Sequence, residues 1–441
     1  MDALPLILFG LVFILILWGF PVAFTLGGVS VIFGLIFLEN ELVFQLLPYR
    51  VYGIMSNFVM LAVPLFVFMG VMLEKSGLAE RMLETMGLLF GRMKGGLAIS
   101  VVIVGALLAA STGIVGATVI TMGLISLPTM LKRGYSPELA TGTIASSGTL
   151  GQIIPPSIVL VLLATQLNVS VGDLFKAAVI PGVLLVLCYL LYLVIFARLR
   201  PDAAPSMPEE ALNEFYQLSS GERVKKILTA FLLPLALIVA VLGSIFAGLA
   251  SPTEAAAIGA IGATLLTVAA KWKKKELKLA MFQDVMRETT KITCMVFMIL
   301  IGATAFSLVF KWLGGDRYFT ELIQQAELSP QMFLFIVMLA VFVAGFFIDF
   351  IEIIFIVVPV VVPVFQAMGI DLVWVGILLA LNLQTSFLSP PFGFALFYLK
   401  GVAPPGITTR HLYRGIIPFV IIQLIFLAVV VIFPEIVTAF I

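Results

Sequence analysis

The sequence predicts an all-α polytopic membrane protein whose two halves are inverted repeats, each with a re-entrant helical hairpin and a broken helix. Three observations lead to this fold class. Hydrophobic residues make up 62% of the chain and charged residues only 11%, with a mean hydropathy of +1.20, a combination that soluble globular domains do not have. Apolar stretches of the roughly 20 residues that a spanning helix needs follow one another along the chain. A Pro-Pro pair also recurs in matched surroundings in the two halves.

Several stretches are typical of ordinary spanning helices: residues 4–18, 20–38, 56–73, 174–197, 228–249, 253–270, 290–311 and 415–438. The first of them has no basic n-region and no small-residue cleavage site. We therefore expect residues 1–55 to supply N-terminal scaffold helices and an amphipathic segment rather than a signal peptide. Cys188 and Cys294 lie in apolar runs without paired spacing, which indicates neither a disulfide nor a metal site.

Two longer apolar stretches, 97–131 and 331–368, are interrupted midway by small or polar residues. The interruptions are Ser111-Thr112-Gly113 in the first stretch and Gly345 to Asp349 in the second. This pattern favours two half-helices that form a re-entrant hairpin. Each hairpin is followed by a stretch with a central Pro pair, which breaks a helix because proline lacks an N–H and clashes with the preceding turn. We therefore predict the following units: broken helices 137–165 and 372–400, a first repeat 56–198 and a second repeat 290–441.

The positions of Lys and Arg predict which side of the membrane each connection faces, because these residues accumulate on the cytoplasmic side. Basic residues flank the first hairpin at both ends, whereas the flanks of the second are mostly acidic. The two hairpins are thus expected to enter from opposite sides, the first from the cytoplasm. Lys311 and Arg317 on the outer side count against this assignment. Both termini are then expected in the periplasm, with 199–226 a cytoplasmic linker and 227–289 scaffold helices followed by a basic cytoplasmic segment.

An internal repeat relates the two halves. The segment SSGTLGQIIPPS at 146–157 resembles LNLQTSFLSPPF at 381–392. A single offset, 390 − 155 = 235, relates the matched positions: Pro155 and Pro390, Pro156 and Pro391, Pro128 and Pro363, Gly134 and Gly369. With the opposite sidedness, this offset predicts inverted repeats, which are typical of secondary transporters because related halves can exchange the side that is open. The alternative is an old duplication that survives only as scaffold.

The two interruptions supply oxygen atoms that suit a cation. Proline pairs free backbone carbonyls, and irregular backbone at membrane depth is tolerated where it is buried in protein or lines a cavity. Carbonyls in such a place suit a hard cation such as Na+. The candidate ligands are Gly151, Ile154 and Pro155 in the first repeat and Asn382, Thr385 and Leu388 in the second. The alternative is a helix kink whose backbone groups are satisfied by neighbouring helices.

Each hairpin tip has its own candidate residues. The half-helix after Ser111 and Thr112 directs unsatisfied N–H groups at the tip and would attract an anion, unless these residues simply cap the helix. Asp349 and Glu352 share one helical face. Asp349 stands where an N-cap is needed, whereas Glu352 lies a turn deeper, where no capping role is expected. A functional role is therefore favoured for Glu352: pairing with a cation, accepting a substrate hydroxyl or carrying a proton.

The motifs STGIVGAT, GTLGQIIPPS, DFIEIIFIVVP and QTSFLSPPFG, in this order, resemble those of the large membrane subunit of tripartite ATP-independent periplasmic (TRAP) transporters over essentially the whole chain. The resemblance implies an elevator-type transporter of the ion transporter superfamily, with sodium as the coupling ion and no cofactor. It also implies two sodium sites: Ser111, Gly151, Ile154 and Pro155 for one, and Gly345, Asn382, Thr385 and Leu388 for the other. The residues expected to contact the solute are Thr112, Gly113, Ser147, Asp349, Glu352 and Gln384.

The resemblance further implies partners and a location. A soluble periplasmic substrate-binding protein would deliver a small organic acid or polyol. A small four-helix membrane subunit would be a separate chain, because the first helix here begins at residue 4. The complex would lie in the lipid of the bacterial inner membrane. The charge pattern gives no indication of a nucleic-acid partner.

Three other functions fit the sequence less well. A stand-alone sodium-coupled anion carrier of related fold is the nearest alternative, and the requirement for a binding protein distinguishes the two. A membrane enzyme would need convergent catalytic groups, but His411, the only histidine, lies in a basic loop, so no catalytic residue is expected. A channel would need a pore ring contributed by identical subunits.

Overall fold

The structure, a computed structural model, describes residues 4–38, 40–207, 209–272 and 277–440. Helices make up all the regular secondary structure among these residues. The prediction of an all-α protein is confirmed. Seven helical stretches of this part of the chain have the length and composition to cross a membrane, or eight if one bent pair counts as a span. The seven are α4 with the preceding turn η1 (Phe58–Lys75), α7 (Val115–Lys132), α10 (Val171–Leu199), α12 (Ser220–Phe246), α13 (Pro252–Trp272), α14 (Leu279–Trp312) and α21 (Thr409–Ile432).

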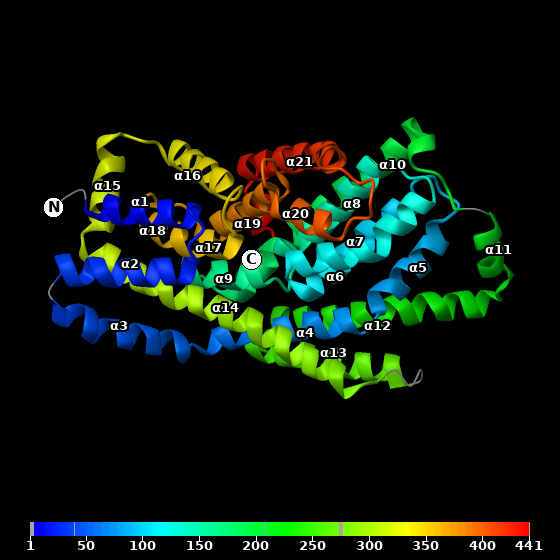
Figure 1. Ribbon diagram of the computed structural model, residues 1–441, viewed down its shortest axis with the longest axis horizontal. Helices are drawn as coiled ribbons and strands as arrows, with labels where there is room; N and C mark the ends of the chain where they lie inside the picture. The colour runs from blue at the N-terminus through cyan, green and yellow to red at the C-terminus, as the bar shows by residue number, and fades with distance from the viewer. Residues whose placement is uncertain (1–3, 39, 208, 273–276, 441) are drawn as a thin grey trace.

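One layer of helices lies along the bottom of Figure 1. It consists of α2 (Val22–Phe37), α3 (Asn40–Met55), α4 (Ala62–Lys75), α12, α13 and α14. Within the layer α2 and α4 pack against α14, and α13 packs against α4 and α12. Glycines allow the closest approach, since a Cβ at Gly302 of α14 would lie only 2.4 Å from the Ala23 carbonyl oxygen of α2. The shorter α1 (Leu4–Leu17) packs on α2.

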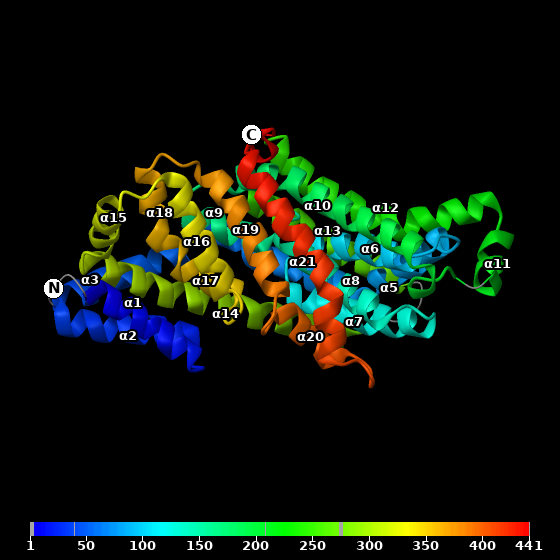
Figure 2. The ribbon, with the colours of Figure 1, turned by 90° about the horizontal axis from the view of Figure 1, so that it is seen from above.

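Two helix groups occupy the predicted hairpin segments. Helices α6 (Gly96–Thr112) and α7 form hairpin 1, which follows α5 (Leu78–Phe90). Helices α16 (Pro330–Ala344), α17 (Phe350–Ile356) and α18 (Val358–Ala367) form hairpin 2, which follows α15 (Gly315–Gln325). Figures 1 and 2 show the tips of both hairpins near the centre of the molecule, with hairpin 1 reaching it from one end of the long axis and hairpin 2 from the other.

Hairpin 2 has a break that the sequence analysis did not predict. Its second arm is two helices, α17 and α18, which meet at Val357 at an angle of 50°. The stretch 331–368 therefore holds three helices, where two half-helices were predicted. Pro359 causes the bend, because it has no N–H to offer the Phe355 carbonyl and its ring crowds the preceding turn.

Each predicted broken helix is two helices joined by an irregular segment. The first is α8 (Pro137–Thr149), a 3₁₀ turn η2 (Leu150–Gln152) and α9 (Ile158–Leu167); the second is α19 (Leu372–Leu388) and α20 (Phe394–Val402). The contacts cross between the halves. Hairpin 1 packs α7 against α20, hairpin 2 packs α17 and α18 against α9, and the helices that follow, α10 and α21, pack against α19 and α8 respectively.

Matched positions of the two halves have the same local backbone. Gly134 and Gly369 both end a helix with positive φ, 82° and 69°. The next helices begin two residues later at matched N-caps, where the side chains of Ser136 and Asp371 accept backbone N–H groups. The Pro155-Pro156 and Pro390-Pro391 bonds are both cis.

The predicted linker is not a free loop. It contains the turn η3 (Pro201–Ala203) and the helix α11 (Glu209–Gln217). The Ala203 and Ala204 carbonyls accept the N–H groups of Ser136 and Gly95 at 3.0 and 2.9 Å, so the linker holds the outer end of hairpin 1. The chain ends with α22 (Glu435–Thr438).

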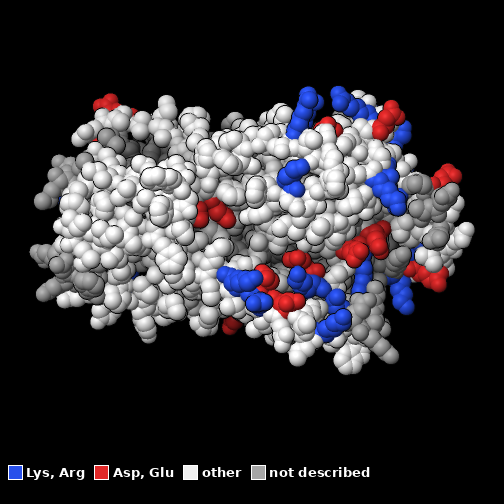
Figure 3. Space-filling view, in the orientation of Figure 1, with Lys and Arg blue, Asp and Glu red and all other residues white. Residues whose placement is uncertain are grey.

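Charge is unevenly distributed over the surface. On the face in Figure 3, most basic side chains gather toward one end together with several acidic ones, and the rest of the face is largely uncharged apart from an acidic patch over α17. Lys75, Lys132 and Arg198 lie in the last turns of α4, α7 and α10, which end toward the basic side. A wide uncharged belt beside a basic end is the surface expected of a membrane protein.

Candidate functional site

The tip of hairpin 1 bridges the break between α8 and α9. A Cβ at Gly151, in the turn η2, would lie 2.7 Å from the Ala109 carbonyl oxygen, so the backbone of α6 lies directly on this turn. Gly113 has φ of 61° and ends α6, and its Cβ position is 3.1 Å from the Ile158 nitrogen at the start of α9. Hairpin 1 therefore contacts both ends of the irregular segment, with glycine at each contact.

The tip of hairpin 2 makes the equivalent contact with α19. A Cβ at Gly345 would lie 2.6 Å from Ser386 Cβ, closer than two such atoms can approach. Deeper along the same interface, the Asn382 side-chain amide donates a hydrogen bond to the Met338 carbonyl of α16 at 2.7 Å. With the offset of 235, Gly151 corresponds to Ser386 (151 + 235 = 386), so the same position of each broken helix contacts a hairpin tip.

Tyr398 of α20 connects the two tips. Its ring packs on α7 next to hairpin 1's tip, where a Cβ at Gly116 would lie 3.1 Å from Tyr398 Cε2. Its hydroxyl is close enough to Asp349 and Glu352 of hairpin 2 to interact electrostatically with both. These two carboxylates stand at the start of α17.

The carboxylates of Asp349 and Glu352 form a capping box. Asp349 is the N-cap of α17 and accepts the Ile351 N–H at 3.4 Å, while Glu352 reaches back and accepts the Asp349 N–H at 3.3 Å. The expectation that Glu352 has no capping role is wrong. A Glu at N3, three residues after an Asp N-cap, accepts a second backbone N–H that has no partner within the helix. The spacing of three between Asp349 and Glu352 is therefore the spacing of a capping box.

A glutamine at position 352 should preserve this cap, because its side-chain oxygen also accepts an N–H. We expect E352Q to keep the wild-type melting temperature and uptake, and E352A to lose about 1 kcal/mol of folding free energy. Thermal unfolding of the purified protein and uptake in proteoliposomes measure the two effects. E222Q and E222A, in the Ser219–Glu222 capping box of α12, provide the matched control. Loss of uptake in E352Q at an unchanged melting temperature would show that the charge of Glu352 is needed.

Two glutamine side chains at the breaks are buried without hydrogen-bond partners. Gln152 is in η2 and Gln384 is in the last turns of α19, and both are fully buried. Neither amide oxygen nor amide nitrogen of either residue has a partner among the described residues. The turn η2 also contacts α19, so both amides belong to the region where the broken helices meet. An unpaired buried amide costs about 1–3 kcal/mol, and a bound ion, solute or water would remove that cost.

The predicted sodium ligands lie at the two tip contacts, in different surroundings. Gly151 and Pro155 are buried, and Ile154 and Pro155 line an apolar cavity of about 260 Å³ between α6, α10 and α12. Thr385 is fully buried, and its hydroxyl donates to the Leu381 carbonyl at 2.7 Å, which leaves the oxygen lone pairs free. Leu388 is the buried last residue of α19.

The remaining predicted contacts are less closely grouped. Ser147 is buried and faces α6, since its Cβ and Oγ lie 2.7 Å from the Cβ position of Gly105, and its hydroxyl donates to the Ile144 carbonyl. The side chains of Ser111 and Thr112 lie outside the described part of the structure.

Gln152 and Tyr398 were not among the residues predicted from the sequence. Gln152 carried a signal, because it is an amide within the apolar GTLGQIIPPS segment that was already assigned to the break. Tyr398 carried none, since an aromatic residue in the run FALFYLK is equally typical of a core position. Only the crossing of α20 onto α7 gives it a place at the tips.

A family model and several known proteins match this chain. The model described as "Tripartite ATP-independent periplasmic transporter, DctM component" matches residues 9–436. A C4-dicarboxylate TRAP transporter large permease protein of Rhodobacter capsulatus is 32% identical over 98% of this chain and 97% of its own length. An ectoine TRAP transporter large permease protein of Halomonas elongata is 31% identical over 96% and 95%. A sialic acid TRAP transporter large permease protein of Vibrio cholerae is 30% identical over 95% and 93%.

One solved structure shares the fold at low sequence identity. The YdaH transporter of Alcanivorax borkumensis superposes with a TM-score of 0.64 and 15% identity, covering 98% of this chain and 99% of that protein. The likeness concerns the arrangement of helices alone.

Proposed function

The chain belongs to the family of the DctM component of tripartite ATP-independent periplasmic transporters, and from this premise we propose that it imports a small organic acid or polyol by sodium-coupled symport. It is a multi-pass membrane transport subunit and not an enzyme. The observation that carries the proposal is the pairing of each hairpin tip with a broken helix whose buried glutamine amide has no protein partner among the described residues. A solute between the tips would supply those partners.

We propose that the two halves are inverted repeats and work as an elevator. The offset of 235, the matched positive-φ glycines and the crossed contacts between hairpins and broken helices support the repeat. The entry of the hairpins from opposite ends supports the inversion. The hairpins and broken helices would move together as the transport domain, against the layer of α2, α3, α4, α12, α13 and α14 as scaffold.

Sodium is proposed as the coupling ion at the two tip contacts. Buried carbonyl and hydroxyl oxygens at a helix break are suitable ligands for a hard cation. The first site would use Ser111, Gly151, Ile154 and Pro155, and the second Gly345, Asn382, Thr385 and Leu388. The free lone pairs of the Thr385 hydroxyl support the second site most directly.

Replacing Thr385 by Val tests the second sodium site, because it removes the hydroxyl and keeps the shape of the side chain. Loss of one buried oxygen ligand costs about 1–3 kcal/mol. We therefore expect T385V to raise the sodium concentration for half-maximal uptake roughly tenfold, with T385S close to wild type. T264V is the control, since Thr264 makes the same hydrogen bond to the carbonyl four residues earlier, in α13. An unchanged sodium dependence in T385V would exclude Thr385 as a ligand.

The solute is proposed to present its carboxylate away from α17. Asp349 and Glu352 place hydrogen-bond acceptors on that side of the tips, so an anionic group is expected to face the start of α7 and the two glutamine amides. Hydroxyl or amino groups of the solute would face the carboxylates. C4-dicarboxylates, ectoine and sialic acid, which the names of the relatives mention, are the first solutes to test.

The partners and the location follow from the family. We propose a separate small membrane subunit, a periplasmic substrate-binding protein and the bacterial inner membrane, with both chain termini in the periplasm. The relatives that this chain matches over nearly their whole length are named large permease proteins, which supports a separate small subunit. The alternative is a stand-alone sodium-coupled anion carrier.

Uptake into proteoliposomes separates the two functions. The chain and its small subunit are reconstituted, and uptake of labelled organic acids and polyols is measured with an inward sodium gradient, with and without the cognate binding protein. The tripartite function predicts uptake only when both sodium and the binding protein are present. Sodium-driven uptake without the binding protein would identify a stand-alone carrier, and uptake independent of sodium would exclude both.

A further inference from the structure

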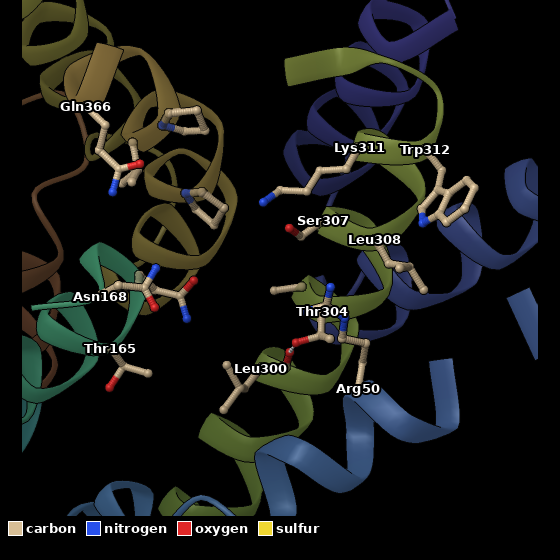
Figure 4. Close-up of a pocket in the computed structure, with 15 residues that line it drawn as sticks. Arg50, Thr165, Asn168, Leu300, Thr304, Ser307, Leu308, Lys311, Trp312 and Gln366 are labelled. Atoms are coloured by element: carbon tan, nitrogen blue, oxygen red, sulfur yellow. Dashed lines mark hydrogen bonds between the residues drawn. The ribbon is translucent and has the colours of Figure 1, made fainter. Parts of the chain in front are cut away.

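A cavity of about 320 Å³ lies away from the hairpin tips, between the scaffold layer and hairpin 2. Helices α3 and α14 form one wall, and the end of α9 with α18 forms the other (Figure 4). It lies at the end of the molecule from which hairpin 2 enters, because α18 leads back toward that end. One wall therefore belongs to the scaffold and the other to the transport domain of the proposed elevator.

The scaffold wall of this cavity is basic. Arg50 of α3 and Lys311 of α14 line it, and no Asp or Glu is among the described lining residues. Figure 4 shows the Lys311 side chain reaching from α14 into the space between the walls, with Ser307 below it. Lys311 Nζ is 3.7 Å from Asp316 Oδ2, which does not line the cavity, and the Lys311 side chain is 51% exposed. Arg50 and Lys311 are thus the only charged residues among the described lining residues, and Asp316 offsets part of the Lys311 charge from outside the cavity.

The facing wall is uncharged and polar. Thr165, Asn168 and Gln366 lie on it in Figure 4. Asn168 ends α9 in the left-handed conformation, with φ of 56°, which fixes its position at the end of the helix. Amide N–H groups on one wall and cationic groups on the other are together the donors that a carboxylate needs.

We propose that this cavity is an anion-receiving vestibule, which binds the carboxylate of an arriving organic acid before the solute reaches the hairpin tips. The proposal rests on the proposed import function. The scaffold provides the attracting charge through Arg50 and Lys311, and the transport domain provides the neutral donors. Movement of α9 and α18 past α14 would separate the walls and release the solute. The vestibule also accounts for Lys311, a basic residue on the side where the charge pattern predicts few.

Thiol labelling tests the charge of the vestibule without requiring transport. The substitution S307C is made in a C188S/C294S background, and the chain is expressed with its small subunit in membrane vesicles. The labelling rate is compared for two methanethiosulfonate reagents, the anionic sulfonatoethyl and the cationic trimethylammonioethyl compound. A cleft lined by one sign of charge concentrates counter-ions about tenfold or more. We expect the anionic to cationic rate ratio at the introduced thiol to fall about tenfold in R50Q/K311Q.

Two controls make the result specific. R317Q removes a positive charge from α15 outside the cavity and should leave the ratio at the S307C thiol unchanged. A thiol introduced by Q331C, at an exposed position at the start of α16, should show no response to R50Q/K311Q. The vestibule is excluded if the ratio at the S307C thiol does not respond to R50Q/K311Q, or if R317Q lowers it equally. Failure of the parent protein to transport would instead contradict the proposed function, because the labelling ratio does not depend on transport.

Discussion

A single added methyl group at Gly345 is expected to reduce uptake by one to two orders of magnitude. The new Cβ would lie 2.6 Å from Ser386 Cβ and still nearer to Ser386 Oγ. The hydroxyl can rotate away, but the Ser386 Cβ is fixed to the backbone of α19, so the tip of hairpin 2 must retract. Overpacking of this kind costs about 1–3 kcal/mol, which corresponds to roughly 5- to 150-fold in an equilibrium that needs the closed tip. Uptake by G345A in proteoliposomes measures the effect.

Removal of the opposing atom should restore function. In G345A/S386G the added methyl group takes the space of the hydroxymethyl group removed from Ser386, so we expect uptake to recover most of the loss. G151A is the matched variant in the first repeat, where the Cβ would lie 2.7 Å from the Ala109 carbonyl oxygen. Because that neighbour is backbone, A109G should not rescue G151A. Normal uptake by G345A would contradict the closed tip, as would a double variant no better than G345A although it folds and melts like wild type.

Replacing Gln384 by Leu should have opposite effects on stability and on uptake. If the amide is without a partner until solute or ion arrives, an apolar side chain of similar size removes a buried unsatisfied group and should keep or raise the melting temperature. The same change removes a hydrogen bond to the bound solute, worth about 1–3 kcal/mol, so the KM for uptake should rise roughly 5- to 150-fold. Q152L should behave in the same way, since Gln152 is equally buried and without a partner among the described residues.

Gln423 provides the control for these two glutamines. It is also buried, but its Nε2 donates to the Tyr189 hydroxyl at 2.6 Å, between α21 and α10. Q423L leaves that hydroxyl without its donor and should lower the melting temperature, with no specific change in KM. A lower melting temperature in Q384L with unchanged KM would assign Gln384 to structure, held by water, and would remove it from the site.

The breaks could be predicted from the sequence because proline and glycine act locally. Pro155-Pro156 and Pro390-Pro391 interrupt helices wherever they occur, and Gly113 permits the left-handed turn that ends α6. The second bend of hairpin 2 obeys the same rule through Pro359, but one proline among Val and Ile is also typical of a kinked continuous helix. The two broken helices were therefore predicted correctly, whereas the bend in the second arm of hairpin 2 was not.

The contacts at the tips could not be predicted, because they depend on which helices cross. Tyr398 reaches the site only because α20 of one half packs on α7 of the other. The capping role of Glu352 was missed for a different reason, since its spacing of three from Asp349 was interpreted only as placing both carboxylates on one helical face, and the same spacing also suits a capping box. The contacts of the predicted linker 199–226 could not be predicted either, because its carbonyls fix hairpin 1 through backbone hydrogen bonds that no side-chain pattern reveals.

The most direct test of the central claim is an electron cryo-microscopy structure of the chain with its small subunit, determined in sodium with a transported solute and again in potassium without it. We predict solute density between the two hairpin tips, in hydrogen-bond contact with Gln152 or Gln384, that is absent in potassium. Solute density that touches neither tip, with both glutamine amides held by the same water molecules in the two structures, would contradict this location of the site.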